Sequence, residues 1–331
     1  MQTDTQEKET IMEPVHRQFL WKRPIVLMGI AAFTTAGTAL AANAADAAHT
    51  LKTVAQIAPE LRPQGVPLDY LVTPVGFFSP SCVKRVQDDT APGAARCTQP
   101  HYRYDGARVE PNGAFFPGKI KASAAAYYSG PIEDAHLTLK DPIGKFQAEW
   151  VVPKAPADID TQSVYYSIEA EGIGPSNSAT VLRSELSYEM GFPNPGAWEL
   201  TVWVQSEGKL YYSGPVEVNE GDVIVGDITK KSGNTWSVRA TDKRTGEAVG
   251  REATVYEMQK IYGGVLRVRD VRNCNQFPSG SPFVFSKVEA FAPNLVDRYS
   301  LPWTLNPPKS ISLPCKFGVS TGPDSSIILS Y

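Results

Sequence analysis

Three stretches, 164–169, 179–190 and 198–205, alternate between apolar and polar side chains. Because successive side chains of a β-strand point to opposite faces, a repeat of two predicts strands rather than helices. One face of each predicted strand is apolar enough to be core, so we expect any functional site on the opposite, polar face. That polar face gathers Tyr165, Glu169, Arg183, Glu185, Trp203 and Gln205.

Similar runs recur from about residue 119 to residue 291. The polar turns at 231–234 and 243–246 have the composition of hairpin connections. Ser-Gly-Pro occurs at 129–131 and at 213–215, and since glycine tolerates a bend and proline cannot continue a ladder, we expect two sheet corners. Many strands with one apolar face each predict an all-β fold, a two-sheet antiparallel β-sandwich whose polar faces would line a groove if the sheets curve.

We place this sandwich at residues 118–292. Residues 45–117 have a mixed composition, with a short helix expected near 50–61. They form either an N-terminal extension packed on the sandwich or a pro-segment. Residues 293–331 are rich in proline, and we expect them to run over the surface as a C-terminal tail.

The first 44 residues have the pattern of a secretory signal peptide. Arg17, Lys22 and Arg23 precede a short apolar run at 25–33, and small residues follow. A membrane-spanning helix needs about 20 apolar residues, so this run is too short to span. We expect cleavage near residues 41–44 and a mature protein that is secreted or periplasmic, without a membrane span.

The amino-acid composition argues against one class of function, nucleic-acid binding. Of 331 residues, 42% are hydrophobic and 20% charged, and the formal net charge is −3. Nucleic-acid binding needs clustered lysine and arginine, which this near-neutral balance does not supply, so we expect no nucleic-acid partner. With 27 prolines and 26 glycines, the chain has the turn-rich composition typical of all-β proteins.

Four cysteines follow the predicted leader, and an exported protein can form disulfides. Three pairings are open, of which Cys82–Cys97 with Cys274–Cys315 is favoured, since it closes one short loop and ties the tail to the sandwich. The chain has no Cys-x-x-Cys motif and few histidines, so we expect no metal and no cofactor.

The order and spacing of several stretches resemble the eqolisin family of glutamic peptidases. The matching stretches are 148–153, 165–169, 179–187, 211–224 and 283–289, within residues 120–292. The resemblance implies a lectin-like double β-sheet and a secreted enzyme that cleaves peptide bonds without metal or cofactor. It also implies one catalytic glutamate and one catalytic glutamine on neighbouring strands.

This sequence departs from the family at both catalytic positions. The family's glutamine corresponds to Arg183, and its glutamate corresponds to Gln205, two residues after Trp203. An amide does not titrate near working pH, so a general base would have to come from elsewhere on the polar face. Glu185 is the best candidate, with Gln205 orienting the oxyanion. We expect Arg183 beside it to lower the pKa of Glu185.

Several readings of the polar face stay open. It could belong to a peptide-bond hydrolase that uses Glu185 with Gln205 and works best at acid pH. It could instead belong to a catalytically degenerate relative that binds a peptide or a carbohydrate through Arg183, Trp203, Tyr165 and Glu169. A solvated outer sheet with ordinary charge pairs is a third reading, and a two-carboxylate glycosidase a remote fourth.

Overall fold

The computed structural model describes residues 51–85, 97–104, 106–111, 128–189, 196–280, 282–308, 311 and 313–331. Within these ranges the chain is almost wholly β-structure, and its helical parts are 3₁₀ turns of three residues each. No helix in the same ranges is long and apolar enough to cross a membrane. The prediction of an all-β fold is confirmed.

The elements follow one another in short steps. The strands are β1 (Leu71–Thr73), β2 (Gly76–Phe78), β3 (Val83–Arg85), β4 (His101–Tyr102), β5 (Arg108–Val109), β6 (Tyr128–Thr138), β7 (Lys145–Val151), β8 (Lys154–Pro156), β9 (Ser163–Ile173), β10 (Ala179–Glu189), β11 (Trp198–Ser206), β12 (Lys209–Tyr212), β13 (Val216–Val218), β14 (Val223–Ser232), β15 (Thr235–Asp242), β16 (Ala248–Thr254), β17 (Glu257–Val271), β18 (Pro278–Ser279), β19 (Phe283–Phe291), β20 (Thr304–Asn306), β21 (Gly318–Thr321) and β22 (Ile327–Ser330). The 3₁₀ turns are η2 (Val54–Gln56), η3 (Pro59–Leu61), η4 (Pro80–Cys82), η5 (Pro175–Asn177), η6 (Cys274–Gln276) and η7 (Pro323–Ser325).

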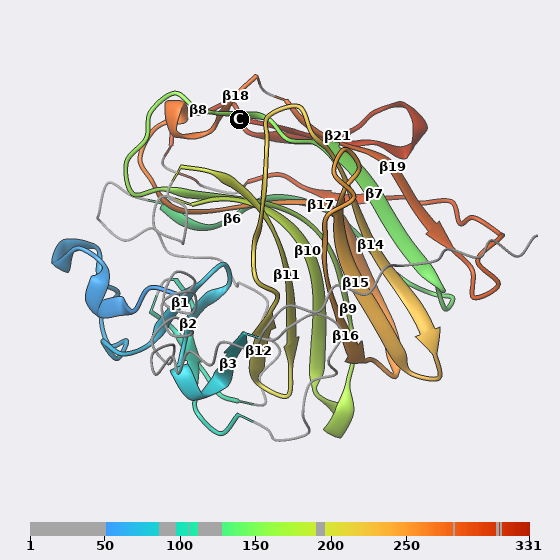
Figure 1. Cartoon of the computed structure of the whole chain (residues 1–331), viewed down its shortest axis with the longest axis horizontal. Coiled ribbons are helices and arrows are strands. Elements are labelled where there is room, and N and C mark those ends of the chain that lie inside the picture. Colours follow the sequence, from blue (N-terminus) through green and yellow to red (C-terminus); the bar gives the residue numbers. More distant parts are fainter. Residues whose placement is uncertain are drawn as a thin grey trace, which may run out of the picture. The chain divides into compact units, whose positions relative to one another are not determined.

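Two large sheets pack face to face (Figure 1). In the described part of the chain, one has nine strands in the order β20-β6-β17-β9-β10-β11-β12-β3, with β13 also paired to β11. The other has seven strands in the order β16-β15-β14-β7-β19-β22-β21. Apolar side chains from both inner faces, such as Leu182 and Val238, form one continuous core cluster. This is the predicted β-sandwich.

Strands β9, β10 and β11 lie at the centre of the nine-stranded sheet and follow the predicted alternation. Leu182 pairs with Val204 and belongs to the sandwich core, whereas its neighbour Arg183 pairs with Trp203 and with Glu169. Residues paired in an antiparallel sheet project to the same side. The predicted polar residues therefore project from the side turned away from the seven-stranded sheet, called the outer face below.

The hairpin predictions are confirmed, and the corner predictions are confirmed at one of two places. Gly233 and Gly246, with positive φ, lie in the turns on either side of β15. Residues 213–215 separate β12 from β13, as expected. Residues 129–131 instead lie inside β6, where the ladder to β17 shifts register opposite Pro131. A bulge thus accommodates the proline without ending the strand.

Two further expectations differ from the structure. The helix expected near 50–61 is replaced by the short turns η2 and η3, and Pro59, which has no amide donor, begins the second. The C-terminal residues are not only a surface tail. Strand β22 pairs with β19, and its Ile327 and Leu329 are buried in the sandwich core.

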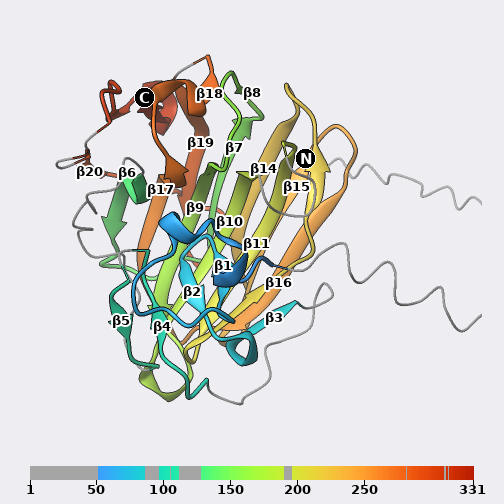
Figure 2. The same ribbon diagram turned by 90° about the vertical axis from the view of Figure 1, so that its left-hand side faces the viewer.

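The described residues between Leu51 and Pro111, called the cover below, pack on the outer face of the nine-stranded sheet. They form a small sheet in the order β1-β2-β4-β5. An apolar cluster of their own supports that sheet, made by Val54, Val66, Tyr70, Val72 and Phe77. Figure 2 shows the cover in front of β10 and β11. Its strand β3 extends the nine-stranded sheet by pairing with β12.

Two disulfides join the pairs that the sequence favoured, Cys82 with Cys97 and Cys274 with Cys315. The first lies within the cover and the second within the sandwich. Each part is therefore cross-linked to itself and not to the other.

Candidate functional site

The structure brings the predicted polar residues onto one face but not into an open groove. Tyr165 and Glu185 have no exposed area, and Glu169, Arg183 and Trp203 are 1%, 5% and 2% exposed. Gln205 is 7% exposed. The expectation of a groove and the alternative of a solvated outer sheet are both wrong, because these residues are buried, and the cover packs on the part of the face around Trp203.

Glu169 is held between two arginines. Arg183 donates from Nε to Oε1 at 2.7 Å, and Arg267 of β17 donates from Nη1 to Oε1 and from Nη2 to Oε2, the latter at 2.9 Å. Ser167 donates its hydroxyl to the same Oε1 at 2.7 Å. Burial by itself raises the pKa of Glu169, but the charges of Arg183 and Arg267 outweigh burial and lower it well below the usual range. Glu169 is thus ionised, and its lone pairs are occupied.

Glu185, two residues from Arg183 on β10, is in the opposite situation. Neither of its carboxyl oxygens has a hydrogen-bond partner among the described residues. Arg183 Nε lies 3.9 Å from its Oε2. Burial raises the pKa of Glu185 to about 8; the charge of Arg183 acts in the expected direction and lowers the pKa, but burial outweighs it. At neutral pH Glu185 is a protonated acid in a dry site.

The register of β10 and β11 keeps Gln205 away from Glu185. Gln205 pairs with Val181, whereas Glu185 pairs with Thr201. Four residues along a strand correspond to roughly 13 Å, too far for both side chains to reach one reacting centre. The two residues share the outer face but do not form a pair in this arrangement.

The cover contacts the outer face through an apolar cluster. Phe78, Val75 and Leu51 from the cover pack with Trp203 of β11 and Tyr212 of β12. The rings of Trp203 and Tyr212 stack at 5.0 Å between centroids and 22° between planes. Trp203 also donates its indole N–H to Thr201 Oγ1 at 3.0 Å, which fixes the orientation of the indole. This part of the outer face is an aromatic surface that polypeptide covers.

Backbone contacts add to the side-chain contacts. Strand β3 pairs in parallel with β12, with Val83, Lys84 and Arg85 opposite Leu210, Tyr211 and Tyr212. The Cys97 amide donates to the carbonyl of Glu207 at 3.1 Å. The cover is therefore bound as extended chain, by main-chain pairing along one edge and by apolar side chains across the face.

Sequence reasoning missed the arginines of β17. Arg267 completes the clamp on Glu169, and Arg269 donates to Ser163 Oγ at 2.8 Å and lies 3.8 Å from Glu189. Both are buried, at 5% and 7% exposed. The signal was present, because 266–269 alternates between apolar residues and arginines within the predicted strand 265–271. No local pattern indicated that β17 pairs with β9, which brings Arg267 to Glu169 and Arg269 to Ser163.

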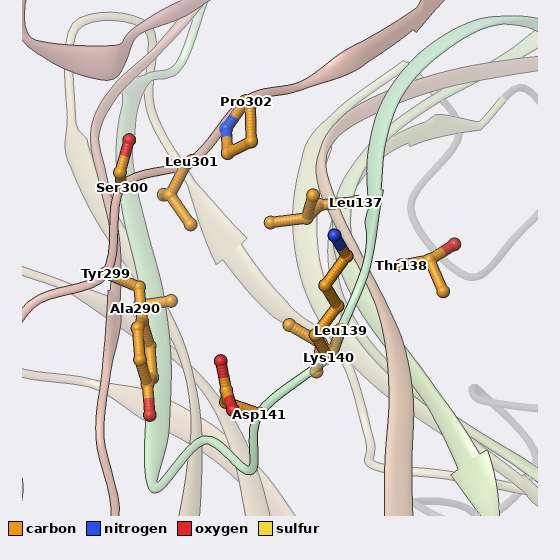
Figure 3. A pocket seen from close by; sticks show the side chains of 10 residues that line it. All are labelled: Leu137, Thr138, Leu139, Lys140, Asp141, Ala290, Tyr299, Ser300, Leu301 and Pro302. Carbon is orange, nitrogen blue, oxygen red and sulfur yellow. The ribbon is translucent and has the colours of Figure 1, made fainter.

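Other site types find little support. No group of three histidine, cysteine or acidic side chains within the described ranges could hold a metal ion. A cavity of about 190 Å³ lies between the end of β6 and residues 299–302, lined by leucines, Tyr299, Lys140 and Asp141 (Figure 3). None of the residues predicted for the site lines it.

No protein-family model matches the chain, and no curated relative matches it. Among solved structures, the chain is similar to SCP-B, a member of the eqolisin family of peptidases, in a complex with the tripeptide Ala-Ile-His. The identity is 13%, over 62% of this chain and 99% of that one, with a TM-score of 0.43.

Two further solved structures give similar or weaker matches. Scytalido-glutamic peptidase with a transition state analog inhibitor gives 14% identity at the same coverage and TM-score. The enzymatically active domain of bacteriophage CBA120 tailspike protein 2 gives 13% identity over 47% of this chain and 23% of that one, with a TM-score of 0.27. At such identities, the roles of the site residues have to be inferred from the geometry of this chain.

Proposed function

We propose that this chain is an exported β-sandwich protein whose outer face binds an extended polypeptide. In the state described, the chain's own cover occupies that face. Two observations support the proposal. The sequence resembles glutamic peptidases, and Glu185 of β10 and Gln205 of β11 lie too far apart to act as a catalytic pair. The two disulfides fit an oxidising compartment outside the cytosol.

The observation that carries the proposal is how the cover is bound. Phe78 and Val75 fill the surface around Trp203 and Tyr212, while β3 adds a strand to the edge of β12. Apolar side chains in pockets together with main-chain pairing along a sheet edge are the two means by which proteins hold extended peptides. The occupant is polypeptide, which favours a peptide ligand over a carbohydrate.

The buried charges suit a binding role better than catalysis. Glu169 with Arg183 and Arg267 forms a satisfied cluster, whose charges are already compensated within the sheet. Such a cluster fixes the positions of β9, β10 and β17 and is poor at proton transfer, because its carboxylate is held ionised. We assign Glu169 and Arg183 to shaping the binding face, and Trp203 to contact with the ligand.

The test is a full-length Phe78→Asp variant. An aspartate in the apolar cluster should separate the cover from Trp203, and the variant should then bind a permanently unfolded polypeptide, such as reduced carboxymethylated lactalbumin. We expect binding at least about ten-fold tighter than that of the wild type, since the binding-competent state becomes the populated one. Fluorescence anisotropy of the labelled polypeptide measures it.

Val284→Asp is the matched control, because it puts the same charge at an exposed apolar residue of β19, away from the cover. It should bind no more polypeptide than the wild type. If hydrogen exchange reports that Phe78→Asp has released the cover and binding still does not rise, the proposed function is wrong.

A second candidate function, peptide-bond hydrolysis, is favoured by Glu185. A fully buried carboxyl whose oxygens lack hydrogen-bond partners in the described part of the chain is costly to maintain, and such groups gather at functional sites. Once hydrated by release of the cover, Glu185 could take a proton from the water that attacks a peptide carbonyl and return it to the leaving amine. The guanidinium of Arg183 lies close enough to favour the ionised base.

Casein cleavage by Phe78→Asp, measured from acid to mildly alkaline pH, decides this candidate. Hydrolysis should disappear in the Phe78→Asp/Glu185→Gln double variant and persist in Phe78→Asp/Gln205→Ala, because Gln205 lies too far along the sheet to share the reacting centre. Cleavage that survives Glu185→Gln would assign the activity to another group. Absence of cleavage at every pH leaves binding as the function.

A further inference from the structure

Strand β3 is an unusual member of its sheet. It has three residues, lies at the edge, and pairs in parallel with β12, whereas the pairs β9–β10, β10–β11 and β11–β12 are antiparallel. Its burial is slight, because Val83 is half-buried and Lys84 and Arg85 are exposed. Parallel pairs are slightly less stable per residue than antiparallel ones. The strand is thus weakly held by its own contacts.

Strand β12, in contrast to β3, is firmly held by its contacts. All four of its residues are buried, and its side chains contribute to the clusters on both faces of the sheet. Without β3, one side of β12 would present unpaired N–H and C=O groups on a well-anchored edge. Such an edge is a template for pairing with another chain.

The side chains of β3 show what this edge accepts. Val83 packs against the cluster that contains Trp203, Leu210 and Tyr212. Arg85 passes over Gly214, where an added Cβ would lie 2.9 Å from its Nη2. An aliphatic residue, one intervening residue and an arginine therefore fit the edge in parallel orientation.

The intervening residue, Lys84, fits poorly. It pairs with Tyr211, two residues from Lys209 on the same strand and hence on the same side of the sheet. Lys209 is only 5% exposed, and burial first and the charge of Lys84 second lower its pKa. Two positive charges thus face each other where an acidic side chain would be attracted.

We propose that the edge of β12 is a strand-addition site for an extended peptide of another molecule, with the pattern aliphatic–acidic–arginine, which runs parallel to β12 and displaces β3. This inference rests on the proposed function and specifies its ligand. Strand β3 matches this pattern at Val83 and Arg85, but it has a lysine, Lys84, where the pattern has an acidic residue.

The test uses the full-length protein and three capped, fluorescein-labelled peptides with Val-Glu-Arg, Val-Lys-Arg or Asp-Glu-Arg at their centres. Val83→Asp in the protein removes the apolar contact of β3 and should free the edge. The variant should bind the Val-Glu-Arg peptide about two- to five-fold tighter than the Val-Lys-Arg peptide, the range expected for one partly exposed charge pair, and the Asp-Glu-Arg peptide not detectably. Wild-type protein should bind all three more weakly, because its tethered strand competes at about millimolar effective concentration.

Lys84→Glu is the converse variant and alters one exposed side chain. It should strengthen the pairing of β3 with β12, slow hydrogen exchange of the Leu210–Tyr212 amides by about two- to five-fold, and weaken peptide binding by the same factor. The proposal is overturned if Val83→Asp binds no peptide, if it binds all three equally, or if Lys84→Glu leaves exchange at β12 unchanged.

Failure of this inference is distinguishable from failure of the proposed function. If Phe78→Asp binds unfolded lactalbumin while Val83→Asp discriminates no peptide, the outer face binds polypeptide but not through the edge of β12. If neither variant binds its probe, both proposals fail.

Discussion

At the scale of single residues, Glu169 and Glu185 have opposite protonation behaviour although they lie on neighbouring strands of one face. Glu169 has two arginines within hydrogen-bond distance, whereas Glu185 is fully buried and its nearest guanidinium nitrogen, from Arg183, lies 3.9 Å away. Direct hydrogen bonds to two guanidinium groups therefore keep one carboxyl ionised, whereas burial without such bonds keeps the other protonated.

Glu169→Gln should be strongly destabilising. It removes the negative charge between Arg183 and Arg267 and leaves two buried cations without compensation, which typically costs about 3–5 kcal/mol. Chemical denaturation of the full-length protein measures the loss. Glu149→Gln is the control, because Glu149 pairs with the exposed lysines Lys243 and Lys287 and should lose no more than about 1 kcal/mol. Equal losses would mean that the clamp on Glu169 is not a stabilising network.

Glu185→Gln should remove a pH dependence of stability. The folded-state pKa of Glu185 is about 8, above the ordinary 4.5. Between these values the unfolded chain has released the proton and the folded chain keeps it. Stability is therefore fully present below about pH 4.5 and is lost as pH rises toward 8, by about 1.4 kcal/mol per unit of pKa difference.

Urea denaturation at pH 5 and pH 8 measures this effect. Glu185→Gln should fall less in stability than the wild type between these two values and should exceed it at pH 8. Parallel changes in the two proteins would show that Glu185 is ionised when the cover is closed.

At the scale of elements, the sequence predicted what depends on local alternation. Strands β9, β10 and β11 are where the period of two placed them, and Arg183 shares a face with Trp203 because the two residues are paired in the antiparallel register. The alternation of apolar and polar residues identifies these strands, although both of their faces are buried in the structure. The sequence left three cysteine pairings open, and the structure has the one with a short loop at Cys82–Cys97 and a link from the tail at Cys274–Cys315.

Contacts between elements far apart in the sequence could not be predicted from local alternation. The contact of Phe78 with Trp203 joins residues far apart in the chain, and neither neighbourhood carries a pattern that specifies the other. The pKa of Glu185 was predicted in the wrong direction for the same reason. Its neighbour Arg183 is visible in the sequence, but the burial that dominates the pKa of Glu185 comes from the tertiary structure.

Within the cover, His101 should make the fold acid-sensitive. It stacks on Phe78 at 4.6 Å between ring centroids, and burial lowers its pKa to about 4. The unfolded histidine binds a proton near pH 6.5, so the stability of the cover is fully present above that value and is lost as pH falls toward 4. We expect a loss of about 3 kcal/mol in local stability over that interval.

Protection factors of the β2 and β4 amides at pH 4.5 and pH 7 test this expectation. His101→Phe should make them nearly independent of pH, whereas His136→Gln, a change in β6 of the sandwich, should leave the acid sensitivity of the cover unaltered. If wild-type protection is the same at both pH values, His101 does not control the cover.

At the scale of the whole molecule, the disulfides divide the described chain into two parts. Cys82–Cys97 closes a loop inside the cover, and Cys274–Cys315 joins two segments of the sandwich. The cover is held to the outer face by the cluster around Trp203 and by β3, without a disulfide across the contact. This arrangement allows the cover to open while the sandwich stays folded, as polypeptide binding by the outer face requires.

Removing each disulfide should therefore weaken a different part. Cys82→Ser/Cys97→Ser opens a loop with a sequence separation of 15 residues, and the stability of the cover should fall by about 3 kcal/mol. Cys274→Ser/Cys315→Ser, with a separation of 41 residues, should lower the stability of the sandwich by about 4 kcal/mol. Native-state hydrogen exchange separates the two effects, because the amides of β1 and β2 report on the cover and those of β10 and β14 report on the sandwich.

Each double variant is the control for the other. If either one lowers protection equally in both parts, the cover and the sandwich unfold as one unit, and a ligand could reach the outer face only by unfolding the whole molecule.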